Sequence, residues 1–142
     1  MPSFTTQVPN LRDIGPVVQV RLTVGSVLEE VLRRSGAALP PPLTVPALID
    51  TGATGTVVRQ DLIPQLNLNP VGTTLISTPS SMNVICYEYL MRIVFPNNVI
   101  IEAVVIGAPL QGQSVACLIG RDVLQHGVLI YTGYTNTFTL SF

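Results

Sequence analysis

The stretch "PALIDTGATGTVV", Pro46 to Val58, decides how the fold of this chain is interpreted. An apolar segment runs into one acidic residue, Asp50, and then into small residues. A segment such as "VPALI" is expected to be an interior strand, and the small residues after it allow a tight turn. The sequence therefore predicts a carboxylate on a loop at the edge of an apolar core. That position suits a catalytic acid or base, although an ordinary turn is the alternative.

The composition indicates one apolar domain with few charges. The chain has 142 residues, of which 47% are hydrophobic and 11% are charged, and we expect a single domain over residues 1–142. So much apolar surface for this size favours a self-association interface. The net charge is −1 and the seven basic residues, all Arg, are scattered, so no nucleic-acid partner is expected.

Neither the apolar runs nor the first residues carry the pattern of a membrane span or a targeting signal. The most apolar run, "NVIIEAVVIGAPL", is interrupted by Glu102 and is shorter than the roughly 18 residues that span a membrane. The first residues, "MPSFTTQVPNLRDIG", lack a basic start followed by an apolar core. We therefore expect no membrane partner and a cytoplasmic location.

Most of the chain has the pattern of β-strands. The segments "VVQVRLTV" (17–24) and "YEYLMRIVF" (87–95) alternate apolar and polar residues, as half-buried strands do. The segment "VIIEAVVIG" (99–107) is mostly branched and apolar, which predicts a strand buried on both faces. Residues 127–142 predict two strands around a Thr-Gly-Tyr turn. Many short strands with frequent turns favour a small β-barrel or sandwich.

Two short helices are predicted among these strands. In "SVLEEVLRRSG", Ser26 is placed as the N-cap, Glu29 completes a capping box and Gly36 ends the helix. This helix and the proline-rich run after it form an insertion over residues 26–42. The segment "GRDVLQHGV" predicts one or two further helical turns. Cys86 and Cys117 are expected to be buried, reduced thiols, because their spacing fits neither a disulfide framework nor a metal site.

A second segment, "ACLIGRDVL" (116–124), carries the family signal together with the Asp50 loop. Both resemble motifs of the retropepsin-like aspartic proteases: a hydrophobic pair before Asp-Thr/Ser-Gly-Ala, and later a hydrophobic pair before Gly-Arg/Met-Asp/Asn. The chain is more similar to the cellular, single-domain branch than to the viral enzymes. Residues 72–95 resemble the flap hairpin of the family, with its tip near Ser77 to Met82. The resemblance runs from about Val17 to Phe142.

This resemblance implies an all-β fold: a small closed acid-protease barrel with one flap hairpin, one or two short helices and a homodimeric assembly. Catalysis in the family needs two aspartates, which share one proton because like charges so close cannot both ionise. The chain has one Asp-Thr-Gly, and "YTGYT" has Tyr131 where an Asp is needed. A complete site would therefore need two chains, each donating Asp50 at a two-fold axis. No metal, cofactor or covalent intermediate is implied.

The resemblance also implies roles for individual residues. Asp50 would be the catalytic aspartate of a protease acting on peptide or protein substrates. The expected site comprises the active-site loop residues Thr51, Gly52 and Ala53, the supporting residues Gly120, Arg121 and Asp122, and the flap residues Thr78, Pro79, Ser80 and Ser81. Viral members usually have an acid where this chain has Thr54, so Arg121 needs another partner, either Asp61 or backbone carbonyls. The C-terminal "TNTFTLSF" (135–142) is expected to contribute to the dimer interface.

Two other functions remain open at this level. The chain could be a non-catalytic dimerisation or peptide-binding domain that retains the protease fold. It could also be a monomer that is inert until a partner or a proteolytic event assembles it.

Overall fold

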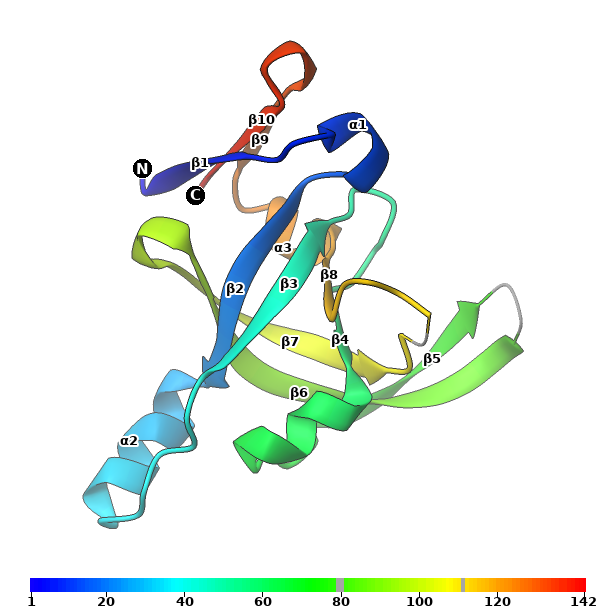
Figure 1. The fold of residues 1–142 in the computed structure, drawn as a ribbon. Helices are drawn as coiled ribbons and strands as arrows, with labels where there is room; N and C mark the ends of the chain where they lie inside the picture. Colours follow the sequence, from blue (N-terminus) through cyan, green and yellow to red (C-terminus); the bar gives the residue numbers. More distant parts are fainter. Residues whose placement is uncertain (79–80, 111) are drawn as a thin grey trace.

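Six strands form a closed barrel in the computed structural model, which describes residues 1–78, 81–110 and 112–142 (Figure 1). The barrel strands, in spatial order, are β2 (Val17–Val24), β3 (Leu43–Ile49), β8 (Cys117–Ile119), β4 (Val57–Arg59), β7 (Val99–Ala108) and β6 (Ser81–Phe95). Pairing of β2 with β6 closes the ring. Closure leaves the barrel without a free edge, which is how small β folds avoid exposed backbone groups. The all-β barrel predicted from the sequence is confirmed.

The strand β7 has one buried face, so the prediction that it is buried on both faces is wrong. Val99 and Val105 are buried, whereas Ile100 and Val104 are 45% and 44% exposed. A strand in a closed barrel turns alternate residues to the interior and the exterior. The apolar side chains on the outer face of β7 therefore remain partly accessible. By contrast, β2 has the bounds and the alternating burial that its sequence predicts.

A hairpin extends from the barrel where β5 (Gly72–Thr78) pairs with the first half of β6. Figure 1 shows it reaching away from the barrel, on the side opposite α2. Thr78 and Ser81 are the last paired positions of the ladder. The hairpin confirms the predicted flap. Two of the expected flap residues, Pro79 and Ser80, lie outside the described residues.

A separate three-stranded sheet brings the two termini together. Its order is β1 (Ser3–Gln7), β10 (Thr137–Ser141) and β9 (Val128–Thr132). Phe4 of β1 stacks on Phe95 of β6 at 5.5 Å between ring centroids, which joins this sheet to the barrel core. Within the sheet, Phe4 meets Phe138 edge-on at 6.2 Å. Because β10 is hydrogen-bonded on both sides, the edges of the sheet are β1 and β9.

Helical segments are more numerous than the one or two predicted. The α-helices are α1 (Leu11–Ile14), α2 (Ser26–Arg34) and α3 (Arg121–Leu124), and the 3-10 segments are η1 (Gln60–Leu66), η2 (Pro96–Asn98) and η3 (Gly133–Thr135). The sequence predicted α2 and α3 but not α1 or η1. Segments as short as α1 and η1 show no helical apolar period, and η1 contains Pro64. The equally short α3 was predicted from the residues that flank it, not from a period. In the described ranges, no helix combines the length and the apolar character that a membrane span requires.

The start of α2 differs from its predicted capping box. Gly25, not Ser26, is the N-cap, and no side-chain cap comes from within the helix. Instead, the Glu102 carboxylate of β7 accepts hydrogen bonds from the Ser26 backbone N–H at 3.0 Å and from its hydroxyl at 2.9 Å. A carboxylate accepts hydrogen bonds from the otherwise unpaired N–H groups of a helix N-terminus. Its negative charge also interacts favourably with the positive end of the helix dipole.

Glu29 links α2 to the barrel through an ion pair and does not form the predicted capping box. It pairs with Arg33 one turn later at 2.7 Å, and also with Arg92 of β6. Arg92 additionally donates to the Val24 carbonyl at 3.0 Å. The predicted stop at Gly36 is confirmed: its φ is +74°, in the left-handed region that favours glycine.

Candidate active site

The topology places the Asp50 loop beside the Gly120-Arg121-Asp122 segment. Strand β3 ends at Ile49, and residues 50–56 connect it to β4. Strand β8 inserts between these two strands, parallel to β3 and antiparallel to β4. The chain therefore leaves β3 and β8 at the same end of the barrel, and two segments some 70 residues apart meet there.

Asp50 is held by its own loop and by β8. Its backbone N–H donates to the Ile119 carbonyl at 2.9 Å. Its Oδ1 atom accepts a hydrogen bond from the Gly52 N–H at 2.9 Å, a side-chain-to-backbone turn typical of Asp. Asp50 is half-buried, while Thr51 and Gly52 are exposed. The Gly52 N–H therefore orients the carboxylate through one of its two oxygens, and the carboxylate lies at the surface of the barrel.

Arg121 braces the same loop from the start of α3. Its Nη1 donates to the Thr51 carbonyl at 2.7 Å and its Nη2 to the Thr54 hydroxyl at 3.2 Å. The expected contact with a backbone carbonyl is confirmed. The alternative prediction, that Arg121 pairs with Asp61, is wrong, because the Asp61 carboxylate pairs with Arg59 at 2.8 Å. The planar guanidinium can reach two acceptors on one loop, which a lysine ammonium cannot do with the same geometry.

Gly120 has no space for a side chain. A Cβ atom there would lie 2.5 Å from the Gly55 carbonyl oxygen and 3.1 Å from that of Ala53. The φ and ψ of Gly120 are −90° and −177°, which any residue can adopt. The requirement for glycine is therefore steric, and it comes from the backbone of the Asp50 loop crossing over this position.

Asp122 points into the loop and binds Thr56. Its Oδ1 accepts from the Thr56 hydroxyl at 2.8 Å, and its Oδ2 accepts from the Thr56 N–H at 3.1 Å. Thr56 is fully buried, and its role was missed from the sequence. A threonine directly before an apolar strand was the available signal, because a hydroxyl buried there needs a partner.

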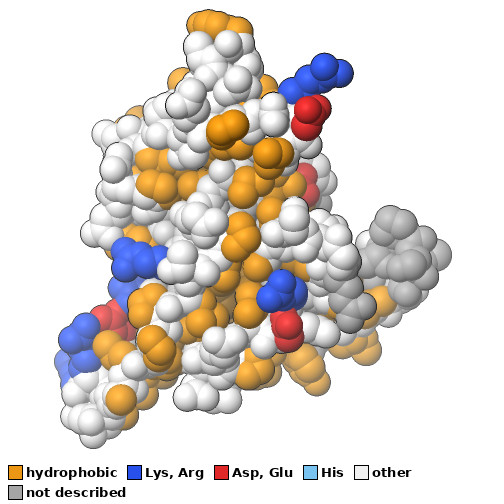
Figure 2. All heavy atoms as spheres, in the orientation of Figure 1, with side chains coloured by type: hydrophobic (Ala, Val, Ile, Leu, Met, Phe, Trp, Pro, Cys, Tyr) orange, Lys and Arg blue, Asp and Glu red, His pale blue; other side chains and the backbone are white. Residues whose placement is uncertain are grey.

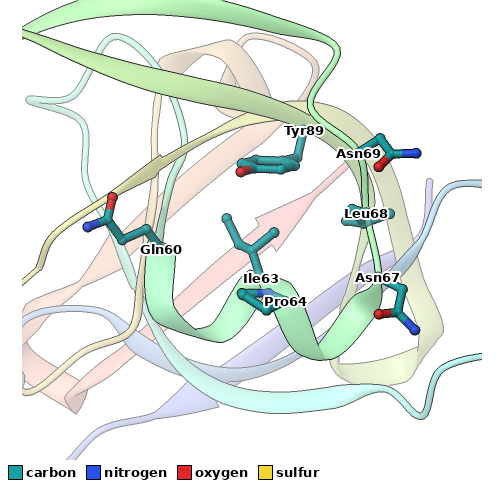
Figure 3. Close-up of a pocket in the computed structure, with 7 residues that line it drawn as sticks. All are labelled: Gln60, Ile63, Pro64, Asn67, Leu68, Asn69 and Tyr89. Carbon is teal, nitrogen blue, oxygen red and sulfur yellow. The ribbon is translucent and has the colours of Figure 1, made fainter.

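A pocket of about 490 Å³ lies between η1 and β6, outside this site (Figure 3). Tyr89 lies on one side of the pocket and Ile63 and Pro64 on the other; the remaining lining residues are Gln60, Asn67, Leu68 and Asn69. No lining residue belongs to the Asp50 loop or to the Gly120-Arg121-Asp122 segment. This pocket is therefore separate from the Asp50 loop.

Both cysteines are buried free thiols, as predicted. Cys117 lies in β8, next to the site, and is fully buried. Burial, aided by the negative charge of Asp122, raises the pKa of its thiol to about 12. The folded state therefore holds this proton more tightly than the unfolded chain, whose ordinary value is 9.0. The resulting stabilisation is complete below pH 9 and is lost as the pH rises toward 12.

We expect Cys117 to make the protein less stable in alkali. Between pH 8.5 and 10.5 the free energy of unfolding of the wild type should fall by about 2 kcal/mol more than that of Cys117→Ala. Urea titrations of both proteins at the two pH values measure the difference, and Cys86→Ala serves as the matched thiol control. Equal pH dependence of wild type and Cys117→Ala would contradict the expectation.

The chain is similar to known proteins in both sequence and structure. A family model described as retroviral aspartyl protease matches residues 13–130. The structure is similar to the crystal structure of a retropepsin-like aspartic protease from Rickettsia conorii, with a TM-score of 0.52 and 8% sequence identity. That alignment covers 100% of this chain and 95% of the other, and at this identity it shows a shared fold. No curated protein sequence matches the chain. The family match includes both the Asp50 loop and the Gly120-Arg121-Asp122 segment, and the chain belongs to the retroviral aspartyl protease family.

Proposed function

We propose that the chain is a homodimeric aspartic endopeptidase in which the Asp50 carboxylates of two chains activate a water molecule. The observation that carries the proposal is the placement of Asp50. It ends a barrel strand, and one carboxylate oxygen is fixed by the Gly52 N–H. The sequence contains a single Asp-Thr-Gly. A family whose chemistry uses two aspartates then requires a second copy of the same loop.

The proposed reaction needs no group beyond the two carboxylates. Close to the two-fold axis they share one proton, because two like charges at that separation cannot both ionise. The ionised carboxylate removes a proton from the water, which attacks the peptide carbonyl carbon. The protonated carboxylate donates its proton to the carbonyl oxygen. Collapse of the tetrahedral intermediate breaks the C–N bond. One carboxyl group donates its proton to the departing amine, and the other carboxylate takes a proton from a hydroxyl of the intermediate, which restores the shared proton.

Exposed apolar surface supports association of two chains. Figure 2 shows hydrophobic side chains spread over the visible face, with charged groups only in separate spots. On β9, Val128, Ile130 and Tyr131 are each about half exposed. The resemblance predicts that residues 135–142 contribute to the interface. Because β10 is already paired on both sides, a partner strand would extend this sheet at β9 or β1. We place the added strand at β9, whose outer residues are apolar.

The flap hairpin supplies the proposed peptide-binding surface. Leu75 and Ile85 are a cross-strand pair, and Tyr87 follows two residues later, so all three share one face. They are 62%, 68% and 55% exposed. An apolar face of this kind fits hydrophobic side chains beside the scissile bond. The residues proposed to bind the peptide backbone are Thr78, Pro79, Ser80 and Ser81.

Subunit mixing tests the shared site directly. Wild-type protein is first given a diverse peptide mixture over pH 3 to 8, and cut sites are identified by mass spectrometry. Asp50→Asn subunits are then added in equal amount at fixed wild-type concentration and allowed to exchange. Random pairing leaves about half of the wild-type subunits in wild-type dimers, so cleavage should fall about twofold. At a ninefold excess it should fall about tenfold.

Two results would overturn the proposal. Unchanged cleavage at a ninefold excess of Asp50→Asn, with exchange verified by mass-labelled subunits, would show that one chain is sufficient. No cleavage by a wild-type protein that sediments as a dimer would favour the peptide-binding alternative.

A further inference from the structure

One peptide unit, Ile119–Gly120, connects the support segment to Asp50. Its carbonyl accepts a hydrogen bond from the Asp50 N–H at 2.9 Å. Its N–H donates to the Thr56 hydroxyl at 3.0 Å. The two groups belong to the same planar amide and point in opposite directions. Rotation of this plane would therefore weaken both hydrogen bonds together. The Thr56 hydroxyl, which binds the N–H of this peptide unit, thus also sets the direction of the carbonyl that binds Asp50.

Thr56 itself is fixed on every polar atom. Its hydroxyl donates to Asp122 Oδ1 and accepts from Gly120, so its hydrogen has a defined direction. Its N–H donates to Asp122 Oδ2, and its carbonyl accepts from the Ile106 N–H at 2.9 Å. The side chain is fully buried, so water does not compete for these bonds. Bonds linked in series and shielded from water reinforce one another.

Asp122 anchors the far end of the chain of hydrogen bonds. Besides the two bonds to Thr56, its Oδ1 accepts from the Val123 N–H at 2.9 Å in the first turn of α3. A carboxylate accepting three donors is held firmly in place and makes the bond from the Thr56 hydroxyl charge-assisted.

We infer that Thr56 is a positioning residue that transmits the anchoring of Asp122 through the Ile119–Gly120 peptide to Asp50. The path runs from carboxylate to hydroxyl, from hydroxyl to peptide plane, and from that plane to the backbone N–H of Asp50. Thr56 does not touch the substrate in this scheme. Its importance for cleavage rests on the function proposed above, but its control of the Asp50 backbone does not.

The test compares Thr56→Val with Thr56→Ser. Valine keeps the shape and removes the hydroxyl, whereas serine keeps the hydroxyl. Amide hydrogen exchange, measured by NMR on the intact protein, follows the Asp50 and Gly52 N–H groups. In Thr56→Val both should exchange at least about tenfold faster than in wild type, because local opening no longer breaks a buried hydrogen bond. Thr56→Ser should stay within about threefold of wild type.

Amides in the β1–β10 ladder report on global stability in the same spectra. The inference is overturned if Thr56→Val leaves Asp50 and Gly52 at wild-type rates. It is also overturned if the β1–β10 amides accelerate as much as those of the loop, since that is global destabilisation. If Thr56→Val does not fold, Asp122→Ala takes its place with the same reporters, because it removes the anchor and leaves the hydroxyl without its acceptor.

Kinetics then separate this inference from the proposed function. If the chain cleaves peptides, Thr56→Val should lower kcat by about a hundredfold with KM within about threefold, because a small displacement of a catalytic group costs that much while binding contacts persist. Thr56→Ser should restore kcat to within about threefold of wild type. An equal loss of kcat in both variants, or a loss confined to KM, contradicts the inference. Absence of cleavage in the wild type would overturn the proposed function alone, since the exchange experiment decides the inference independently.

Discussion

Replacing Asp50 with asparagine is expected to reduce peptide cleavage by about 10⁴-fold or more. Each active site would lose both its general base and its general acid, because the same residue supplies the two roles from two chains. The fold should be retained: the asparagine carbonyl oxygen can still accept the hydrogen bond from the Gly52 N–H, and the bond from residue 50 to Ile119 uses the backbone. Initial rates on a peptide identified from the mixture, at its optimal pH, measure the effect.

Asp61→Asn is the matched control for this substitution. It makes the same chemical change at a carboxylate that is 68% exposed and that, among the described residues, forms an ion pair with Arg59 alone. Exposed ion pairs contribute at most about 1 kcal/mol, so the control should cleave at the wild-type rate. A folded, dimeric Asp50→Asn protein that cleaves as fast as Asp61→Asn would remove Asp50 from the mechanism.

The substitution Gly120→Ala is expected to have the largest effect on stability, a loss of about 3 kcal/mol or more. The added Cβ would lie 2.5 Å from the oxygen and 2.6 Å from the carbon of the Gly55 carbonyl. These are backbone atoms, so relief requires the Asp50 loop to move away from β8 rather than one side chain to rotate. Peptide cleavage should fall about a hundredfold as well, because the loop carries Asp50. Urea unfolding and initial rates measure the two effects.

Gly36→Ala provides the comparison. Among the described residues, no atom beyond the two chain neighbours lies within 4 Å of a Cβ at that position, so the cost of the substitution is expected to come from its φ of +74°. A left-handed conformation costs alanine about 1 kcal/mol. The contrast separates steric exclusion from backbone strain. If Gly120→Ala proves no less stable than Gly36→Ala, the crossing of the two segments is looser than these distances indicate.

Local patterns were sufficient for the parts of the fold that depend on one segment. The alternation over 17–24 is the strand β2, and residues 127–142 form the two strands and the turn that their pattern predicts. The apolar segment before Asp50 is a strand, and the small residues after it form a tight loop. In β2 the alternation encodes which face is buried, and burial of apolar side chains is a strong local determinant.

Pairing between distant segments was decided by the tertiary structure. Nothing near Thr56 in the sequence identifies Asp122, 66 residues away, as its partner. The same is true of Glu102 at the start of α2, and of Arg121, which binds a carbonyl and a hydroxyl instead of Asp61. The two-sided pairing of β10 likewise depends on β1 from the other end of the chain. Polar groups in a closed barrel bind whichever partner the strand order brings within reach, and that order is set by packing of the whole core. The sequence by itself thus determined several of the strands and the position of Asp50 directly after one of them, whereas only the tertiary structure determined which groups hold the Asp50 loop in place.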